Sequence, residues 1–147
     1  MIERLVKGPV ITKSAPVVEA ALHDDLKRLR ADLAGMVGSV IATRDGLLIA
    51  ADLPSGIEPN GMAALTASQL ALGTRIAATG LPADIEFHEV AISSSGGHIV
   101  VYSAGPYAAL TILAEPSVNL GRLHLESRPL ARHIAERLAA VLGTEPR

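Results

Sequence analysis

The chain has no cysteine and very few aromatic residues, which make up 2% of its 147 residues. The absence of cysteine excludes disulfide bonds, thiolate catalysis and thiolate metal ligands, and it is typical of a protein in a reducing cytoplasm, where we expect this chain. Since Phe87, Tyr102 and Tyr107 are the only aromatic side chains, there is no stacking platform for single-stranded nucleic acid. The core must therefore consist of Val, Ile, Leu and Ala, which predicts close packing and few large pockets.

A large excess of positive or negative charge is also absent, because the formal net charge is -2. This balance gives no reason to expect nucleic acid or an anionic membrane as a partner. Near the start, Glu3, Arg4 and Lys7 interrupt every short apolar run, so no signal peptide is expected. No apolar stretch is long enough to span a membrane.

Motifs for chemistry are missing too. The five histidines show no metal-ligand spacing, and Ser93–Gly97 is not followed by the Lys and Ser/Thr of a phosphate-binding loop. There is no Gly-x-Ser-x-Gly elbow. We therefore expect no catalytic residue, no metal and no cofactor, and hence not an enzyme.

The length predicts one domain, which we place at residues 17–143. Residues 1–16 are expected to be a flexible tail because Gly8-Pro9 and Ala15-Pro16 break regular structure, and residues 144–147 a second tail. A helix is then expected from Pro16, because apolar residues recur at helical spacing. These are Val18, Leu22, Leu26, Leu29 and Leu33.

A β-hairpin is predicted over residues 37–52, where two apolar runs meet at Asp45-Gly46. This dipeptide favours a type I′ turn, in which both central residues have positive φ. Three further strands are expected at residues 85–93, 98–104 and 108–114, the first with a bulge near His88 because its apolar alternation changes phase.

The last helix is predicted over residues 119–142. Pro129 falls inside it and should cause a kink or a break. Its arginines, Arg122, Arg128, Arg132 and Arg137, are expected to form a solvated face with Glu126 and Glu136. Asp24-Asp25 and Glu86-His88-Glu89 are likewise expected to face water.

The helix predicted over residues 61–79 is apolar almost all round, so it must be covered on more than one side. A second copy of the same helix is the simplest cover, since Ala64, Ala67 and Ala71 permit close approach; this predicts a homodimer. The mixed face of Leu65, Ser68, Gln69, Leu72, Arg75 and Ile76 is either a partner-binding surface or dimer packing alone. Arg44, at the hairpin tip, is a further candidate for contacting a partner.

In this order, the segments Gly38–Ala50, Ala63–Gly73, Gly105–Ala114 and Asn119–Glu126 resemble the roadblock family, or dynein-light-chain-like domain. The likeness is greatest to its bacterial branch, near the Mgl-type regulators of Ras-like GTPases. It covers about residues 18–142. The resemblance implies an α+β sandwich of the roadblock/profilin type. Its five-stranded antiparallel sheet would have the order 2-1-5-4-3, with the central helix on one face and the terminal helices on the other.

The resemblance also implies a homodimer in which the hairpin strand of Leu47, Leu48, Ile49, Ala50 and Ala51 pairs with its copy. It implies a small GTPase as partner, whose hydrolysis is changed without a donated catalytic residue, and a sensor-kinase-like protein in the same signalling set. Two alternatives stay open: a structural scaffold with no effect on GTP turnover, and a small-ligand sensor. Pro129 departs from the uninterrupted last helix of the family.

Overall fold

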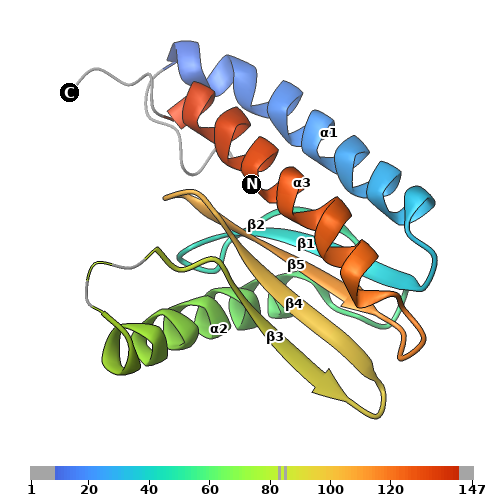
Figure 1. Ribbon diagram of the computed structural model, residues 1–147. Coiled ribbons are helices and arrows are strands. Elements are labelled where there is room, and N and C mark those ends of the chain that lie inside the picture. Colours follow the sequence, from blue (N-terminus) through green and yellow to red (C-terminus); the bar gives the residue numbers. More distant parts are fainter. Residues whose placement is uncertain (1–8, 83, 85, 143–147) are drawn as a thin grey trace.

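The computed structural model describes residues 9–82, 84 and 86–142. One five-stranded antiparallel sheet, in the order β2-β1-β5-β4-β3, lies between two layers of helices. Helices α1 and α3 cover one face and α2 covers the other (Figure 1). The elements are α1 (Pro9–Asp32), β1 (Met36–Thr43), β2 (Leu48–Asp52), α2 (Pro59–Gly80), β3 (Glu89–Ser94), β4 (Gly97–Ala104), β5 (Ala108–Ala114) and α3 (Leu120–Leu142). The fold class and strand order expected from the sequence are confirmed.

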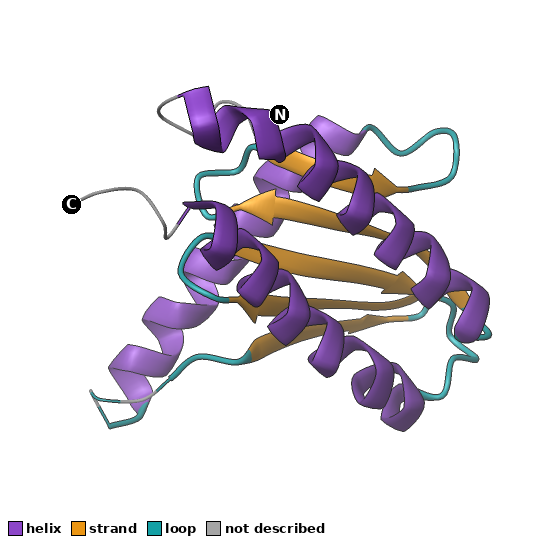
Figure 2. Ribbon diagram, turned by 90° about the horizontal axis from the view of Figure 1, so that it is seen from above, coloured by secondary structure: helices purple, strands orange, loops and turns teal. Residues whose placement is uncertain are grey.

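The main core lies between the sheet and the α1–α3 layer, where the two helices run side by side (Figure 2). The predicted stripe of α1 is confirmed: Leu22, Leu26 and Leu33 are almost fully buried. Helix α1 nevertheless begins at Pro9, so Pro16 lies inside it and not in its first turn. Pro16 removes one helical hydrogen bond, but it is exposed, and water can satisfy the carbonyl group that loses its partner. The rest of the predicted tail, residues 1–8, lies outside the described residues.

The β1–β2 hairpin exists, but its turn is not type I′. Within the turn, only Gly46 has positive φ, at 92°, and every positive φ among the described residues belongs to a glycine. The Gly46 amide donates to the Thr43 carbonyl at 3.0 Å, and the Thr43 amide donates to the Leu47 carbonyl at 2.8 Å. This is a three-residue loop in which a type I turn is followed by a left-handed glycine, so Asp45 keeps an ordinary conformation.

Strand β3 begins at Glu89, later than predicted. It pairs with β4 without a register shift, so the prediction of a bulge near His88 is wrong. Phe87 and Val90 pack together against the same cluster on the α2 side. Two residues three apart cannot share a face of a regular strand. The change of phase in the sequence therefore marks an irregular approach to the strand.

Helix α3 continues through Pro129, so of the kink or break expected there the break does not occur. Proline removes the bond to the carbonyl group four residues earlier, here that of Leu125. The Leu125 side chain is 71% exposed, so this turn of the helix borders on water, which can replace the lost donor. The helix begins after Asn119, whose side chain accepts a hydrogen bond from the Arg122 amide at 3.0 Å.

Asp25 is buried, contrary to the expected solvated face of α1. Its carboxylate lies between α1 and α3, at 3.3 Å from Arg28, 3.6 Å from His133 and 3.5 Å from Arg137. Arg137 also donates to His133 Nε2 at 2.8 Å. Two arginines expected to pair with glutamates on their own helix thus pair elsewhere, since Arg128 binds Glu89 of β3.

Helix α2 is fixed to the middle of the sheet by a buried hydrogen bond. The hydroxyl oxygens of Thr66 on α2 and Thr111 on β5 lie 2.7 Å apart, and both residues are almost inaccessible to water. Around them Ala63, Ala67 and Leu70 are buried against the strands. This contact and the buried side chains around it turn one side of α2 towards the sheet, so that the opposite side faces outward.

Thr66→Val is expected to lower the free energy of unfolding by about 1–3 kcal/mol, because it leaves the Thr111 hydroxyl buried without a partner. Thr111→Val should have a similar effect. The double variant should be closer to the wild type than the sum of the two single variants, since it removes both polar groups. Chemical denaturation of the four proteins measures this coupling, and purely additive losses would contradict the contact.

Candidate functional site

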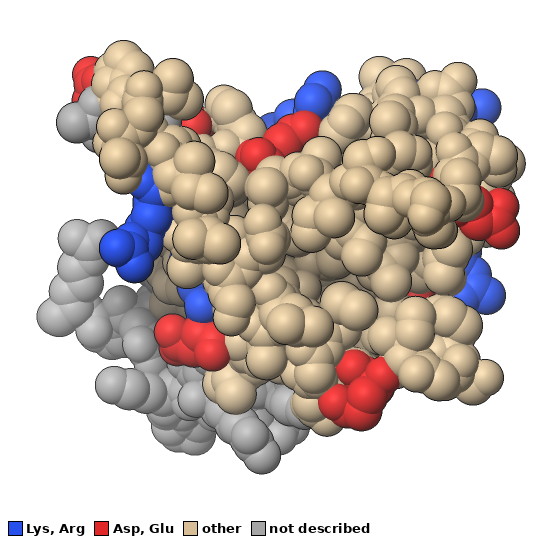
Figure 3. Space-filling model, turned by 90° about the horizontal axis from the view of Figure 1, so that it is seen from below, with Lys and Arg blue, Asp and Glu red and all other residues tan. Residues whose placement is uncertain are grey.

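The outward side of α2 carries an apolar ridge, formed by Leu65, Leu72 and Ile76. Their side chains are 64%, 53% and 64% exposed. They face away from the sheet because the opposite side of the helix is occupied by the buried residues around Thr66. Figure 3 shows this face of the molecule, on which uncharged residues predominate and charges lie mostly towards the rim. Large apolar side chains clustered in this way are typical of an interaction surface.

The helix that carries the ridge is almost free of charge, since Arg75 is the one ionisable residue of α2. At its start the Glu58 carboxylate accepts hydrogen bonds from the amides of Asn60 and Gly61, at 3.0 and 2.6 Å. These bonds lower the pKa of the Glu58 carboxyl group and satisfy amide groups that a helix start leaves free. The cap therefore stabilises the first turn of α2 within the protomer.

The structure brings most of the predicted partner-binding residues together. Leu65, Ser68, Leu72, Arg75 and Ile76 are exposed on α2, and Gln69 beside them is half-buried. The predicted dimer residues Ala64 and Ala71 are exposed on one flank of the ridge. Ala67 is instead buried within the protomer, near Gly46 of the β1–β2 turn.

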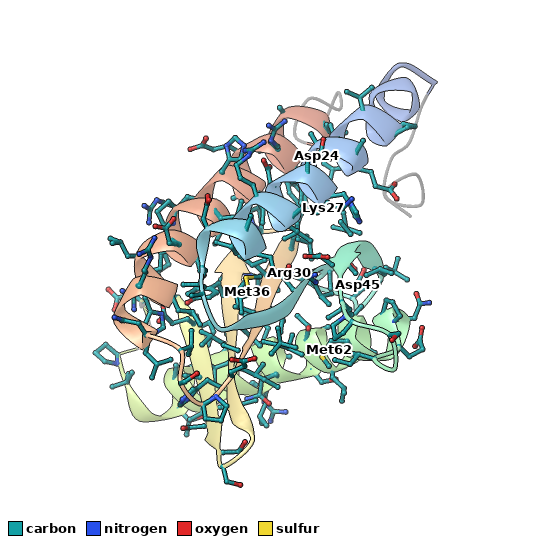
Figure 4. The ribbon with its side chains drawn as sticks, turned by 90° about the vertical axis from the view of Figure 1, so that its right-hand side faces the viewer. Asp24, Lys27, Arg30, Met36, Asp45 and Met62 are labelled. Atoms are coloured by element: carbon teal, nitrogen blue, oxygen red, sulfur yellow. The ribbon has the colours of Figure 1, made fainter. Side chains whose placement is uncertain are left out.

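Strand β2 is one outer edge of the sheet, and no strand of the described part of the chain lies beyond it. Ile49 and Ala50 are buried in the main core, while Leu48 and Ala51 are half-buried on the α2 side together with Met62. Leu47 is half-buried where the turn meets the strand. The open edge and the start of α2 therefore adjoin, as the positions of Met62 and Asp45 in Figure 4 show.

An ion pair with α1 anchors the C-terminal end of β2. Arg30 reaches from α1 towards the sheet (Figure 4) and forms an ion pair with Asp52 at 3.4 Å. The edge strand is thus held at its Asp52 end by a charge pair and at its other end by the turn at Gly46.

Arg44 does not join the ridge. Its guanidinium group donates to the Gly105 carbonyl at 3.0 and 3.2 Å and to the Ser103 hydroxyl at 2.8 Å. These bonds tie the hairpin tip to the β4–β5 turn. The tip is accessible, as the sequence suggested, but its arginine belongs to a different part of the surface.

That part is an open hollow of about 1170 Å³ at the surface, between the last turns of α2, the segment before β3, the β4–β5 turn and α3. Leu81, Phe87 and Ala131 supply apolar lining, and three arginines reach it from two elements: Arg44, Arg128 and Arg132. No sequence pattern predicted this hollow, because the residues that line it are far apart in the chain.

Polar groups beside the hollow form a connected set between β3, β4 and α3. Arg128 donates two hydrogen bonds to the Glu89 carboxylate, both at 2.8 Å, and these bonds lower the pKa of Glu89. The Tyr102 hydroxyl lies 2.7 Å from His124 Nδ1. Burial raises the pKa of this hydroxyl well above its usual value, so it stays protonated. No group of three or more possible metal ligands occurs among the described residues.

Arg128→Gln is expected to reduce the melting temperature at neutral pH, and the reduction should disappear in acid. Because the folded-state pKa of Glu89 lies below its usual value of 4.5, its contribution to stability is present above that pH and is lost as the pH falls through the lowered folded-state value. Thermal unfolding at about pH 6 and about pH 3 tests this. Arg132→Gln, which removes no described ion pair, is the control; an equal loss for Arg128→Gln at both pH values would contradict the expectation.

Comparison with known proteins gives a consistent result. A family model described as the Roadblock/LC7 domain matches residues 22–114. A Roadblock/LC7 domain from Streptomyces avermitilis superposes with a TM-score of 0.72 at 21% identity, over 79% of this chain and 96% of that one. Myxococcus xanthus MglB gives 0.75 at 16% identity, over 84% and 91%.

Profilin IA from Acanthamoeba castellanii superposes with a TM-score of 0.54 at 13% identity, over 78% of this chain and 97% of that one. No curated protein matches the sequence. At these identities the solved structures establish the fold and its likeness to roadblock and profilin domains. Among the described residues, no helix is long and apolar enough to cross a membrane.

Proposed function

The chain belongs to the Roadblock/LC7 domain family, and from this premise we propose that it is a homodimeric regulator or adaptor of a Ras-like small GTPase. In this proposal the β2 edges and α2 helices of two copies meet. The two apolar ridges then form one docking face for the GTPase. The similarity to MglB of Myxococcus xanthus and the resemblance to Mgl-type regulators support this reading of the family.

The observation that carries the proposal is the apolar, almost uncharged ridge of α2 next to an open sheet edge. Leu65, Leu72 and Ile76 are more than half exposed in the protomer, and exposing large apolar side chains to water is unfavourable. A second copy covers the edge through backbone hydrogen bonds. A partner that spans the two helices covers the ridge.

We infer that the protein acts without contributing a catalytic group. Arg75 is the one ionisable side chain of α2, while Arg44 and Arg128 are engaged in hydrogen bonds away from the ridge. Arg75 is the one arginine of α2 that could reach the phosphates of a GTPase site, and the resemblance to Mgl-type regulators argues against that role. Regulation would therefore work by changing the shape of the GTPase's own site, and a sensor-kinase-like protein is a further expected member of the complex.

Affinity capture from the native lysate tests this function. The wild-type protein is immobilised, and capture is run in parallel with a non-hydrolysable GTP analogue and with GDP. A small GTPase retained more strongly with one nucleotide is the expected result, and it also supplies the partner for a hydrolysis assay. Recovery of other proteins equally in both lanes would favour the scaffold alternative and contradict GTPase regulation.

A second candidate, a small-ligand sensor, is favoured by one observation only, the open hollow of about 1170 Å³. A thermal-shift screen against metabolites tests it. A ligand that raises the melting temperature of the wild type and not of Arg44→Ala would support sensing at this hollow.

A further inference from the structure

The second outer edge of the sheet, strand β3, offers free backbone groups. The Ser103 amide donates to the His88 carbonyl at 2.8 Å, and Glu89 lies opposite Tyr102 in the β3–β4 ladder. Hydrogen-bonded and non-hydrogen-bonded pairs alternate in an antiparallel ladder. The amide and carbonyl groups of Glu89, Ala91 and Ser93 therefore point away from β4, out of the sheet.

Within the described part of the chain, this edge lacks the usual protection against strand addition. Strand β3 contains no lysine, arginine or proline, and its residues from Ala91 to Ser94 are exposed. Its one charge, Glu89, is turned towards α3 and bound by Arg128. Ile92, on the α2 side, is 40% exposed. Natural edge strands without charge, proline or a covering segment are ready templates for another strand.

The hollow described above opens at the start of this edge, since Glu89 is one of its lining residues. Two of its arginines carry charges that no carboxylate of the described chain neutralises. Arg44 donates to uncharged oxygens only, and Arg132 takes part in none of the ion pairs among the described residues. Glu86 and Glu89 are the carboxylates that line the hollow, and Glu89 is already neutralised by Arg128.

We propose that the outer edge of β3 binds an extended segment of another protein as a sixth strand, with an acidic side chain of that segment in the hollow near Arg44 and Arg132. The backbone groups of Glu89, Ala91 and Ser93 supply the hydrogen bonds, which is the mode of β-strand addition. The arginines select an acidic segment by charge complementarity. A second copy of β3 fits less well, because its one carboxylate is held by Arg128 of its own protomer.

The site lies on the opposite edge of the sheet from β2. A segment bound at β3 would therefore leave the proposed dimer edge and the ridge of α2 available. The protein would then have an anchoring site for an acidic tail or linker in addition to its proposed GTPase face. A substitution at one of these two sites could abolish binding there and leave binding at the other intact.

Selection of binding peptides tests the proposal. The probe is a displayed library of random peptides of about 10 residues, long enough to cover β3 and reach the hollow. We expect enriched peptides to combine alternating β-branched residues with Asp or Glu near one end. Ala91→Pro removes an outward amide and no bond to β4, and it should weaken their binding about tenfold. Arg132→Glu should weaken it at least as much.

Ala91→Thr keeps the amide and is the matched control, with circular dichroism and melting temperature measured for every variant. Retention of affinity in Ala91→Thr together with its loss in Ala91→Pro supports strand addition. The proposal is overturned if no peptide is enriched, if enriched peptides bind Ala91→Pro as well as the wild type, or if they are not acidic. Self-association that Ala91→Pro abolishes would assign the edge to a second copy and also overturn it.

Discussion

Replacing Leu72 by aspartate should abolish dimer formation or partner binding while leaving the protomer folded. Leu72 is 53% exposed in the protomer, so the fold tolerates a charge there. In an interface the carboxylate would be buried without a described basic partner beyond Arg75, the one ionisable residue of α2. Burying an unpaired charge costs several kcal/mol, which corresponds to a loss of affinity of about 100-fold or more.

The control for this variant is Leu125→Asp on α3, where an apolar side chain is 71% exposed on a different surface. Light scattering gives the mass of each variant, and capture on the immobilised proteins gives partner retention. If Leu72→Asp keeps both the mass and the retention of the wild type, the ridge is neither a dimer nor a partner surface. If Leu125→Asp has the same effect as Leu72→Asp, the loss does not arise from the ridge.

The largest loss of stability is expected from Gly97→Ala, at the start of β4. A Cβ atom there would clash with the carbonyl oxygen of Ala114 in β5, and the φ of 137° is unfavourable for any residue with a side chain. The atom it meets is backbone in a central strand, which cannot move aside without disturbing the sheet. We expect a decrease of more than about 3 kcal/mol in the free energy of unfolding.

Gly56→Ala separates the two causes of this loss. Gly56 also has positive φ, at 98°, but an added Cβ would meet no atom within 4 Å. Backbone strain alone should then cost about 1–2 kcal/mol. Denaturant unfolding of both variants measures the difference, and equal losses would show that the close approach of Gly97 to β5 is not a constraint.

Local patterns in the sequence were enough to predict most of the helices and strands, whereas the layers and the strand order were implied by the family resemblance. The helical stripe of Leu22, Leu26 and Leu33 and the Asp45-Gly46 turn each depend on residues close together in the chain, and the family resemblance supplied their arrangement. The predicted type of turn was wrong, because the Asp45-Gly46 pattern alone does not determine φ at Asp45. The hydrogen bonds of Thr43 with Gly46 and Leu47 close a three-residue loop instead of a two-residue one. No break occurs at Pro129, because an exposed helix turn tolerates a missing hydrogen bond.

The polar contacts between elements could not be predicted in the same way. Asp25 was expected to be solvated because two of its three partners, His133 and Arg137, are over a hundred positions away in the sequence. The pairing of Glu89 with Arg128 likewise depends on how α3 crosses the sheet. The candidate ridge could be predicted, because helical periodicity alone places Leu65, Leu72 and Ile76 on one side of α2.

The most direct test of the account is the mass of the untagged wild-type protein in solution, measured by light scattering at micromolar concentration. The dimer through β2 and α2 is the claim on which the proposed GTPase face depends. A mass of twice the 15.2 kDa of the chain is the predicted result. A mass of one chain throughout the micromolar range would contradict the homodimer and the docking face built on it.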